Sequence, residues 1–431
     1  MRQTLLLGLL LLLTIPLLAQ DTNTESNSMT DSRFYHYTYH QKTGNRFING
    51  QGTFPNVTVD DVQLEASPQW IIGANQDIDA PLLANIFAVQ LTNDTIHLWD
   101  AETRELTDTN WSQASEQSFV LYPWRGGWTS LDSQNDNLSH PTEIGAYNGM
   151  PVVAEVTSTG RLQLAGGLTT GIDLNIQPDA RIVLSDDGRI AVYANATNQR
   201  YVHGIMGDDI EGASLVVLRI NDEQLDIIEQ IDLEGDAVYE GLSPMWADIN
   251  QDGVQDLVTT VSDSQSGSRI RVYLFTENGI LTVDGQAIGQ SNRWQHQLAW
   301  GAFGVNGEMQ LVDVLTPHIG GWVRFYEFDG TQLLIQTQLT GYTSHVIGSR
   351  NLDMAVAGDF DGDGQPEIVL PSQDRQRIAG IRNSAEGAVV AWELELNGTL
   401  VTNLAGLNTP SGLALAVGRD DGTMRVWSSQ D

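Results

Sequence analysis

The sequence contains no cysteine, and only one of its 431 residues is a lysine, Lys42. The absence of cysteine excludes disulfide bonds, thiolate zinc sites, a cysteine nucleophile and a lipid-modified N-terminal cysteine. Positive charge is scarce overall, because 55 acidic residues face 21 basic ones and the formal net charge is −34. A chain of this charge repels phosphate groups, so we predict no binding to nucleic acid and none to anionic membrane surfaces.

Recognisable catalytic motifs are missing as well. The chain has no Gly-x-Ser-x-Gly nucleophile elbow and no Gly-x-x-x-x-Gly-Lys phosphate loop. Its eight histidines are scattered, and the pair with helical metal-site spacing, His36 and His40, lies in an alternating segment that reads as a strand. We therefore predict that the protein is not an enzyme.

A long hydrophobic run occurs only at the N-terminus. An apolar stretch from Leu5 to Leu18 follows a short basic start and ends at the small residue Ala19, which predicts a secretory signal peptide over residues 1–19. The run is shorter than the roughly 20 residues of a membrane span, and it contains Pro16. Residues 20–45 are predicted to be a disordered polar leader. We expect a secreted or periplasmic protein, monomeric and not inserted in a membrane once the signal is cleaved.

The chain does contain an internal repeat. Residues 247–258 (ADINQDGVQDLV) resemble residues 358–369 (GDFDGDGQPEIV), and the two segments lie 111 residues apart, which is twice a period of about 55. Prolines that precede apolar runs keep a similar spacing from Pro81 to Pro410. Turn pairs suited to hairpins, such as Thr159-Gly160 and Asp421-Gly422, separate the apolar runs.

Four short strands repeated at this period are typical of a β-propeller, a ring of sheets around a channel. We predict an all-β fold with seven blades of four antiparallel strands, and six or eight blades stay open. The propeller would span residues 46–431. Its ring would be closed by residues 46–79 pairing with residues 409–431, because the last unit is too short to form a blade alone.

Two acidic loops carry the clearest chemical signal. Oxygen-bearing side chains occupy positions 1, 3, 5 and 9 of each loop, and a glycine occupies position 6. Oxygen ligands at odd positions of a tight loop converge on one point, which suits a hard cation such as Ca²⁺. An EF-hand needs a glutamate at position 12, where this chain has Thr259 and Leu370 in apolar runs, so the pattern predicts a strand–loop–strand site. The alternative is a pair of ordinary Asp/Asn/Gly turns.

These two segments resemble the FG-GAP/VCBS repeat, the calcium-binding blade motif of integrin α-subunit propellers and of many secreted bacterial proteins. The full motif covers two of the predicted units, and residues 301–312 form a degenerate third without the acids. The resemblance implies two structural Ca²⁺ ions, held by two sets of ligands: Asp248, Asn250, Asp252 and Asp256 in the first loop, and Asp359, Asp361, Asp363 and Glu367 in the second.

Aromatic residues suggest a place for a ligand. Trp124, Arg125 and Trp128 lie on a Gly/Pro-rich segment that would suit stacking on a sugar ring, and Trp246 lies near the start of a predicted inner strand. The alternative is packing between blades.

The resemblance and the acidic loops favour a calcium-stabilised binding or adhesion module for a glycan or protein ligand. Two alternatives stay open: a polysaccharide lyase or hydrolase that uses the channel mouth, and a periplasmic scaffold similar to WD40 or TolB propellers.

Overall fold

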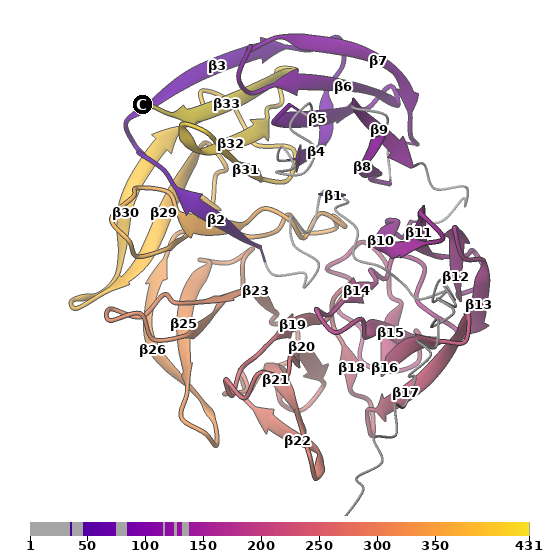
Figure 1. The fold of residues 1–431 in the computed structure, drawn as a ribbon. Helices are drawn as coiled ribbons and strands as arrows, with labels where there is room; N and C mark the ends of the chain where they lie inside the picture. The colour runs from indigo at the N-terminus through magenta and orange to yellow at the C-terminus, as the bar shows by residue number, and fades with distance from the viewer. Residues whose placement is uncertain are drawn as a thin grey trace, which may run out of the picture.

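The computed structural model describes residues 35–36, 46–74, 84–114, 117–124, 127–131 and 138–430. The predicted signal peptide lies outside the described residues, and so does the predicted leader except for Tyr35–His36. The described part of the chain forms β-strands and their connections, and the sheets stand in a ring as a β-propeller (Figure 1). The prediction of an all-β propeller is therefore confirmed.

Five sheets are discrete blades, each built around an antiparallel meander. One blade consists of β4 (Pro68–Ala74), β5 (Ile86–Leu91), β6 (Thr95–Asp100) and β7 (Leu106–Ser112), and the next of β10 (Thr142–Tyr147), β11 (Met150–Val156), β12 (Arg161–Gly166) and β13 (Thr170–Asp173). A third consists of β23 (Gln295–Gly301), β24 (Gln310–Leu315), β25 (Trp322–Phe328) and β26 (Leu333–Thr340). The last two are β27 (Val356–Asp359), β28 (Glu367–Pro371), β29 (Arg377–Ser384) and β30 (Gly387–Glu395), with β2 (Phe47–Gln51) beside β27, and β31 (Ala405–Thr409), β32 (Gly412–Gly418) and β33 (Thr423–Ser429), with β3 (Val57–Gln63) beside β33.

A sheet of nine strands contains two further meanders. Its strands are β14 (Val183–Leu184), β15 (Ile190–Thr197), β16 (Glu211–Asn221) and β17 (Gln224–Asp232), then β18 (Val238–Tyr239), then β19 (Met245–Ala247), β20 (Asp256–Asp263), β21 (Gly267–Thr276) and β22 (Gly279–Asp284). The two-residue strand β18 joins the meanders, because Tyr239 pairs with Gly212 on one side and with Val261 on the other. A three-stranded sheet combines β1 (Tyr35–His36) with β8 (Val120–Trp124) and β9 (Gly127–Leu131).

The predicted count of seven four-stranded blades is wrong, because the propeller has five discrete blades. Two local features explain why the repeat period predicts the wrong number of blades. The backbone pairing of β18 merges two repeats of the sequence into one sheet. The predicted unit 80–140 also divides, since β5–β7 belong to one sheet while β8 and β9 pair with each other in another.

Hydrophobic side chains fill the spaces between neighbouring sheets. Leu298 and Phe325 of the β23–β26 blade, for example, pack with Ile368 and Ile381 of the β27–β30 blade. Similar clusters join β10–β12 to β15 and β16, and β5 to the last strands of the chain. These clusters bury the facing surfaces of neighbouring sheets, which explains the nearly continuous apolar character of the inner strands.

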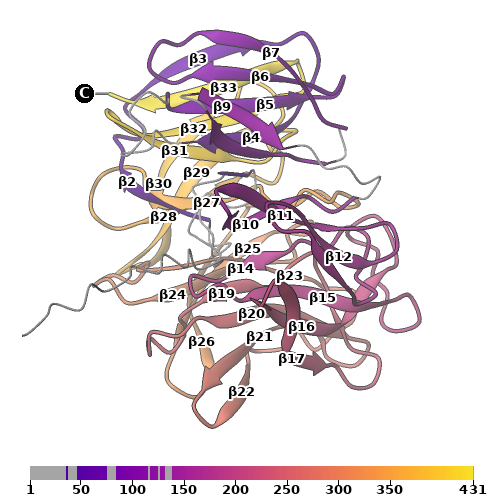
Figure 2. The same cartoon turned by 45° about the vertical axis from the view of Figure 1, so that its right-hand side comes forward.

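An N-terminal strand and the last strand of the propeller lie side by side. β3 lies beside β33 (Figure 2) and pairs with it antiparallel. Asp61 faces Arg425 across this pair. The Arg425 guanidinium donates to both Asp61 carboxylate oxygens at 2.7 and 2.6 Å. β2, which precedes β3, runs parallel to β27 instead. The N-terminal segment thus contacts two neighbouring blades.

Among the described residues, no helix is long and apolar enough to cross a membrane.

Candidate calcium site

The two acidic loops occupy the same place in their sheets. The first connects β19 to β20, and the second connects β27 to β28. The strand pairing next to each loop is also the same, since Ala247 faces Asp256 and Gly358 faces Glu367. The sequence similarity therefore corresponds to equivalent turns between a first and a second strand.

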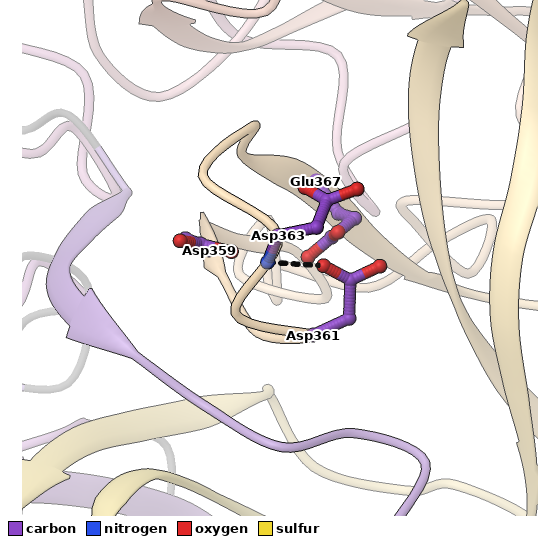
Figure 3. A group of neighbouring side chains, drawn as sticks. All are labelled: Asp359, Asp361, Asp363 and Glu367. Carbon is purple, nitrogen blue, oxygen red and sulfur yellow. Dashed lines mark hydrogen bonds between the residues drawn. The ribbon is translucent and has the colours of Figure 1, made fainter.

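The local hydrogen bonds of the two loops match position by position. The glycine at position 6 donates its N–H to the aspartate at position 1, at 3.0 Å from Gly253 to Asp248 and 3.1 Å from Gly364 to Asp359. Both glycines have positive φ angles, 88° and 92°, a conformation that favours glycine. The N–H at position 5 likewise donates to the side chain at position 3, as Asp363 does to Asp361 (Figure 3). Backbone-to-side-chain hydrogen bonds therefore give both turns the same shape.

The second loop gathers four carboxylates. One oxygen from each of Asp359, Asp361, Asp363 and Glu367 lies within 4.8 Å of the others, and no other such group of three or more acidic or histidine side chains occurs among the described residues (Figure 3). Carboxylate oxygens at this spacing are the ligands that Ca²⁺ prefers. The residue types and their convergence therefore fit a calcium ion.

Burial makes this group unusual for four acids. Glu367 is completely buried, and Asp359 is only 9% exposed. The backbone N–H of Phe360 donates to Glu367 Oε2 at 2.9 Å, while Oε1 has no hydrogen-bond partner among the described residues. Asp359 Oδ1 is also buried without a partner. Buried carboxylate oxygens without partners are unfavourable unless a cation or a proton compensates them.

The same environment shifts the pKa values of these carboxyl groups. Burial, followed by the nearby Asp361 carboxylate, raises the pKa of Glu367 to about 9. Burial also raises the pKa of Asp361. Both shifts have the direction expected where negative charges are held together away from water. A divalent cation between these oxygens would instead favour the ionised carboxylates.

The first loop does not bring its acids together in this way. Asp256, at the position of Glu367, has a hydrogen bond to each carboxylate oxygen, from the N–H of Ile249 at 3.1 Å and the N–H of Phe275 at 2.9 Å. Burial raises the pKa of Asp256 to about 7. Asn250 contributes an amide, which donates to Asp252 at 2.9 Å. The two loops thus share a backbone shape but differ in how completely their acidic oxygens are already satisfied.

Two residues beside the second loop were not anticipated from the sequence. Arg382 on β29 forms an ion pair with Asp363 and lies 3.7 Å from an oxygen of Asp361. Gln51, at the end of β2, donates from Nε2 to Asp359 Oδ2 at 2.8 Å. Neither lies near the loop in sequence, so only strand pairing brings them there.

The predicted ligand-binding aromatics have different outcomes. Arg125 lies outside the described residues, and the side chains of Trp124 and Trp128 are not described, although their backbones belong to β8 and β9. Trp246 is completely buried in the nine-stranded sheet, where its indole N–H points to Val183 O and the Arg189 guanidinium lies 4.6 Å from the ring centroid. Trp246 therefore packs between the two meanders, the alternative that the sequence left open.

A scan of the chain against protein-family models finds no match, and a search of the curated proteins finds none either. The fold defines the class of the protein, a β-propeller.

Proposed function

We propose that the protein is a secreted, calcium-stabilised β-propeller of the FG-GAP/VCBS type that acts as a non-enzymatic binding module for a glycan or protein ligand. The observation that carries the calcium assignment is the buried Glu367 carboxylate, which has an oxygen without a partner and faces three other acids. The matching hydrogen bonds of the two loops support the FG-GAP/VCBS resemblance, because they are shared by segments 111 residues apart.

A bound ion would act on the structure of the propeller. The second loop joins two strands of one blade, and its acids also contact β2 through Gln51 and β29 through Arg382. Arg382 supplies one positive charge to four carboxylates, which leaves an excess of negative charge for a divalent ion to neutralise. The first loop is the second proposed site, and there Asp248 and Asp252 would have to exchange backbone donors for the ion.

Calorimetric titration of the full chain with CaCl₂, before and after treatment with EDTA, tests the proposal. We expect saturable binding by the wild-type protein and at least a tenfold weaker second-loop site in Glu367→Gln. Glu386→Gln, in the exposed β29–β30 turn of the same blade, is the matched control and should bind as the wild type does. Absence of calcium binding, or equal binding by both variants, would contradict the proposal.

A further inference from the structure

A groove of about 430 Å³ lies between the β10–β13 blade and the β14–β17 meander. Three segments and the single residue Ile210 form it. The segments are the turn 157–160 before β12, the connection 175–178 after β13, and residues 196–199 at the end of β15. They come from neighbouring sheets on one side of the ring (Figure 1). A groove of this volume has the size of a small-ligand site.

Hydrogen bonds between the walls fix the shape of the groove. The N–H of Ile176 donates to Gly160 O at 2.9 Å, and the N–H of Ala196 donates to Asn175 O at 2.8 Å. A side chain at Gly160 would approach the backbone of Ile176 to 2.9 Å, and its φ of 74° also favours glycine. Asn175 likewise adopts a positive φ, of 50°. The walls are therefore tied together without a ligand, which reduces the ordering that binding would require.

The lining of the groove carries no charge. None of its twelve lining residues is ionisable, although the chain has 55 acidic residues and a net charge of −34. Ile176, Pro178 and Ala196 give it an apolar floor that is buried or half-buried. Hydroxyl and amide side chains rise around this floor, and those of Ser158 and Asn198 are exposed.

Two of the polar side chains at the rim, Ser158 and Asn198, are available for hydrogen bonds. The Ser158 hydroxyl and the Asn198 amide nitrogen have no hydrogen-bond partner among the described residues, and Asn198 Oδ1 accepts only from the neighbouring Gln199, at 2.6 Å. The groove thus presents donors and acceptors of uncharged type above a small apolar surface.

This combination selects one class of ligand. An anion would find no cationic side chain in the groove and would enter against the negative charge of the whole protein. A cation would find no carboxylate among the lining residues. A purely apolar molecule would leave the hydroxyls and amides unpaired. A sugar has both an apolar C–H face and many hydroxyls, so it can use the floor and the rim together.

We propose that this groove binds an uncharged oligosaccharide. The inference rests on the proposed role as a binding module, but it does not depend on calcium at the loops. The groove residues do not include Trp124, Arg125 or Trp128, which the sequence suggested as ligand-binding residues.

Saturation-transfer NMR and calorimetry with maltotriose, cellotriose and mannotriose as uncharged probes, and trigalacturonate as the charged probe, test the proposal. We expect at least one uncharged trisaccharide to bind and trigalacturonate not to bind. Asn198→Ala and Ser158→Ala should each weaken that binding about tenfold, and Ala196→Tyr, which fills the groove, should abolish it. Asn278→Ala and Asn278→Tyr, in the exposed β21–β22 turn, are the matched controls.

The alternative outcomes separate the two proposals. Trisaccharide binding that survives all three groove variants would overturn the groove and leave the binding function intact. Failure of every uncharged probe, or binding of trigalacturonate alone, would overturn the oligosaccharide proposal whether or not calcium binds. Groove binding by a protein that takes up no calcium would instead support the groove and contradict the calcium proposal. Unchanged melting curves of Asn198→Ala and Ser158→Ala would show that their effect is local.

Discussion

At the scale of residues, Glu367 and Asp256 occupy equivalent positions in their loops but differ in their hydrogen-bond partners. Both are buried at position 9 of equivalent loops, and both accept a hydrogen bond from the N–H at position 2. Asp256 uses its second oxygen to accept from Phe275, whereas the second oxygen of Glu367 has no such partner. Glu367 is therefore the acid whose charge most needs a cation.

Replacing Glu367 by glutamine should change stability in opposite directions with and without calcium. In EDTA, Glu367→Gln removes a buried carboxyl that must take up a proton on folding at neutral pH, because burial raises its pKa to about 9. Its melting temperature should therefore equal or exceed that of the wild type, by about 1 °C for each kcal/mol gained. In excess CaCl₂ the wild type should be the more stable, because the ion binds only its folded state tightly. Thermal unfolding under both conditions measures this crossover. A variant less stable than the wild type by the same amount in both conditions would contradict it.

The sequence predicts the loop acids but not their burial. The spacing of Asp359, Asp361 and Asp363 is a local property, because a tight turn brings odd positions together. The burial of Glu367 depends on distant residues. Phe54 from the N-terminal segment packs on Phe360 of the loop and on Trp392 of β30, with ring centroids 5.2 and 5.0 Å apart. No local pattern marks that contact, so the distinction between the two loops appears only in three dimensions.

At the scale of elements, the N-terminal segment lies directly on the second loop. The N–H of Gly52 donates to Asp359 O at 2.8 Å, and the N–H of Phe54 donates to Phe360 O at 2.9 Å. A side chain at Gly52 would lie 2.3 Å from Phe360 O, so this approach requires glycine. Because β3 follows and pairs with β33, order in this loop supports the strand that joins the two ends of the ring.

Calcium should therefore slow exchange in the N-terminal strand. We expect backbone amides of residues 47–54 to exchange at least several-fold faster in EDTA than in CaCl₂, because loss of the ion loosens Asp359 and Phe360. β22, in a different sheet, provides the internal reference and should change little. Hydrogen–deuterium exchange with mass spectrometry measures both segments. Equal calcium effects on β2 and β22, or none on either, would contradict this link.

The number of blades shows what an element-level prediction misses. The predicted turn pairs Thr159-Gly160 and Asp421-Gly422 do connect paired strands, and both glycines have positive φ angles. A repeat of about 55 residues cannot indicate that Tyr239 will pair on both sides and join two meanders. The groove was missed for a related reason, because its walls come from three short segments of ordinary Ser, Thr, Asn and Gln residues.

At the scale of the whole molecule, three histidines from separate segments of the chain gather around the buried Trp294. The Trp294 ring lies over His296, with centroids 4.8 Å apart, and also contacts His318 and His345. His345 Nε2 donates to Ser349 O at 2.6 Å, so its Nδ1 accepts from His318 Nε2 at 2.7 Å. Burial, followed by the charge of His203, lowers the pKa of His318 to about 4, and burial lowers that of His345 to about 3. Burial and Arg46 also lower the pKa of His296.

These histidines should make the protein sensitive to mild acid. They are neutral in the folded state, whereas unfolded histidines take up protons near pH 6.5. The free energy of unfolding should therefore be highest above pH 6.5 and should fall as the pH drops towards about 4. The loss is at most about 1.4 kcal/mol per pH unit for each fully buried histidine. Melting temperatures at pH 7.5 and 5.0 in saturating CaCl₂ measure the loss, and His318→Gln should reduce it. Glu240, Arg46 and Arg181 line the same cavity as Trp294 and His296. A flat profile would contradict the account.

At this scale the calcium proposal also has its most direct test, because the whole chain is acidic and the proposal singles out one loop. With 55 acidic residues in the sequence, only the second loop gathers four of them at metal-ligand distance within the described residues. The decisive measurement is the melting temperature of the EDTA-treated protein before and after addition of CaCl₂, together with elemental analysis of the protein as purified. The account predicts bound calcium and a melting temperature that rises with calcium concentration. A melting curve that calcium does not move, in a protein that holds no calcium, would contradict it.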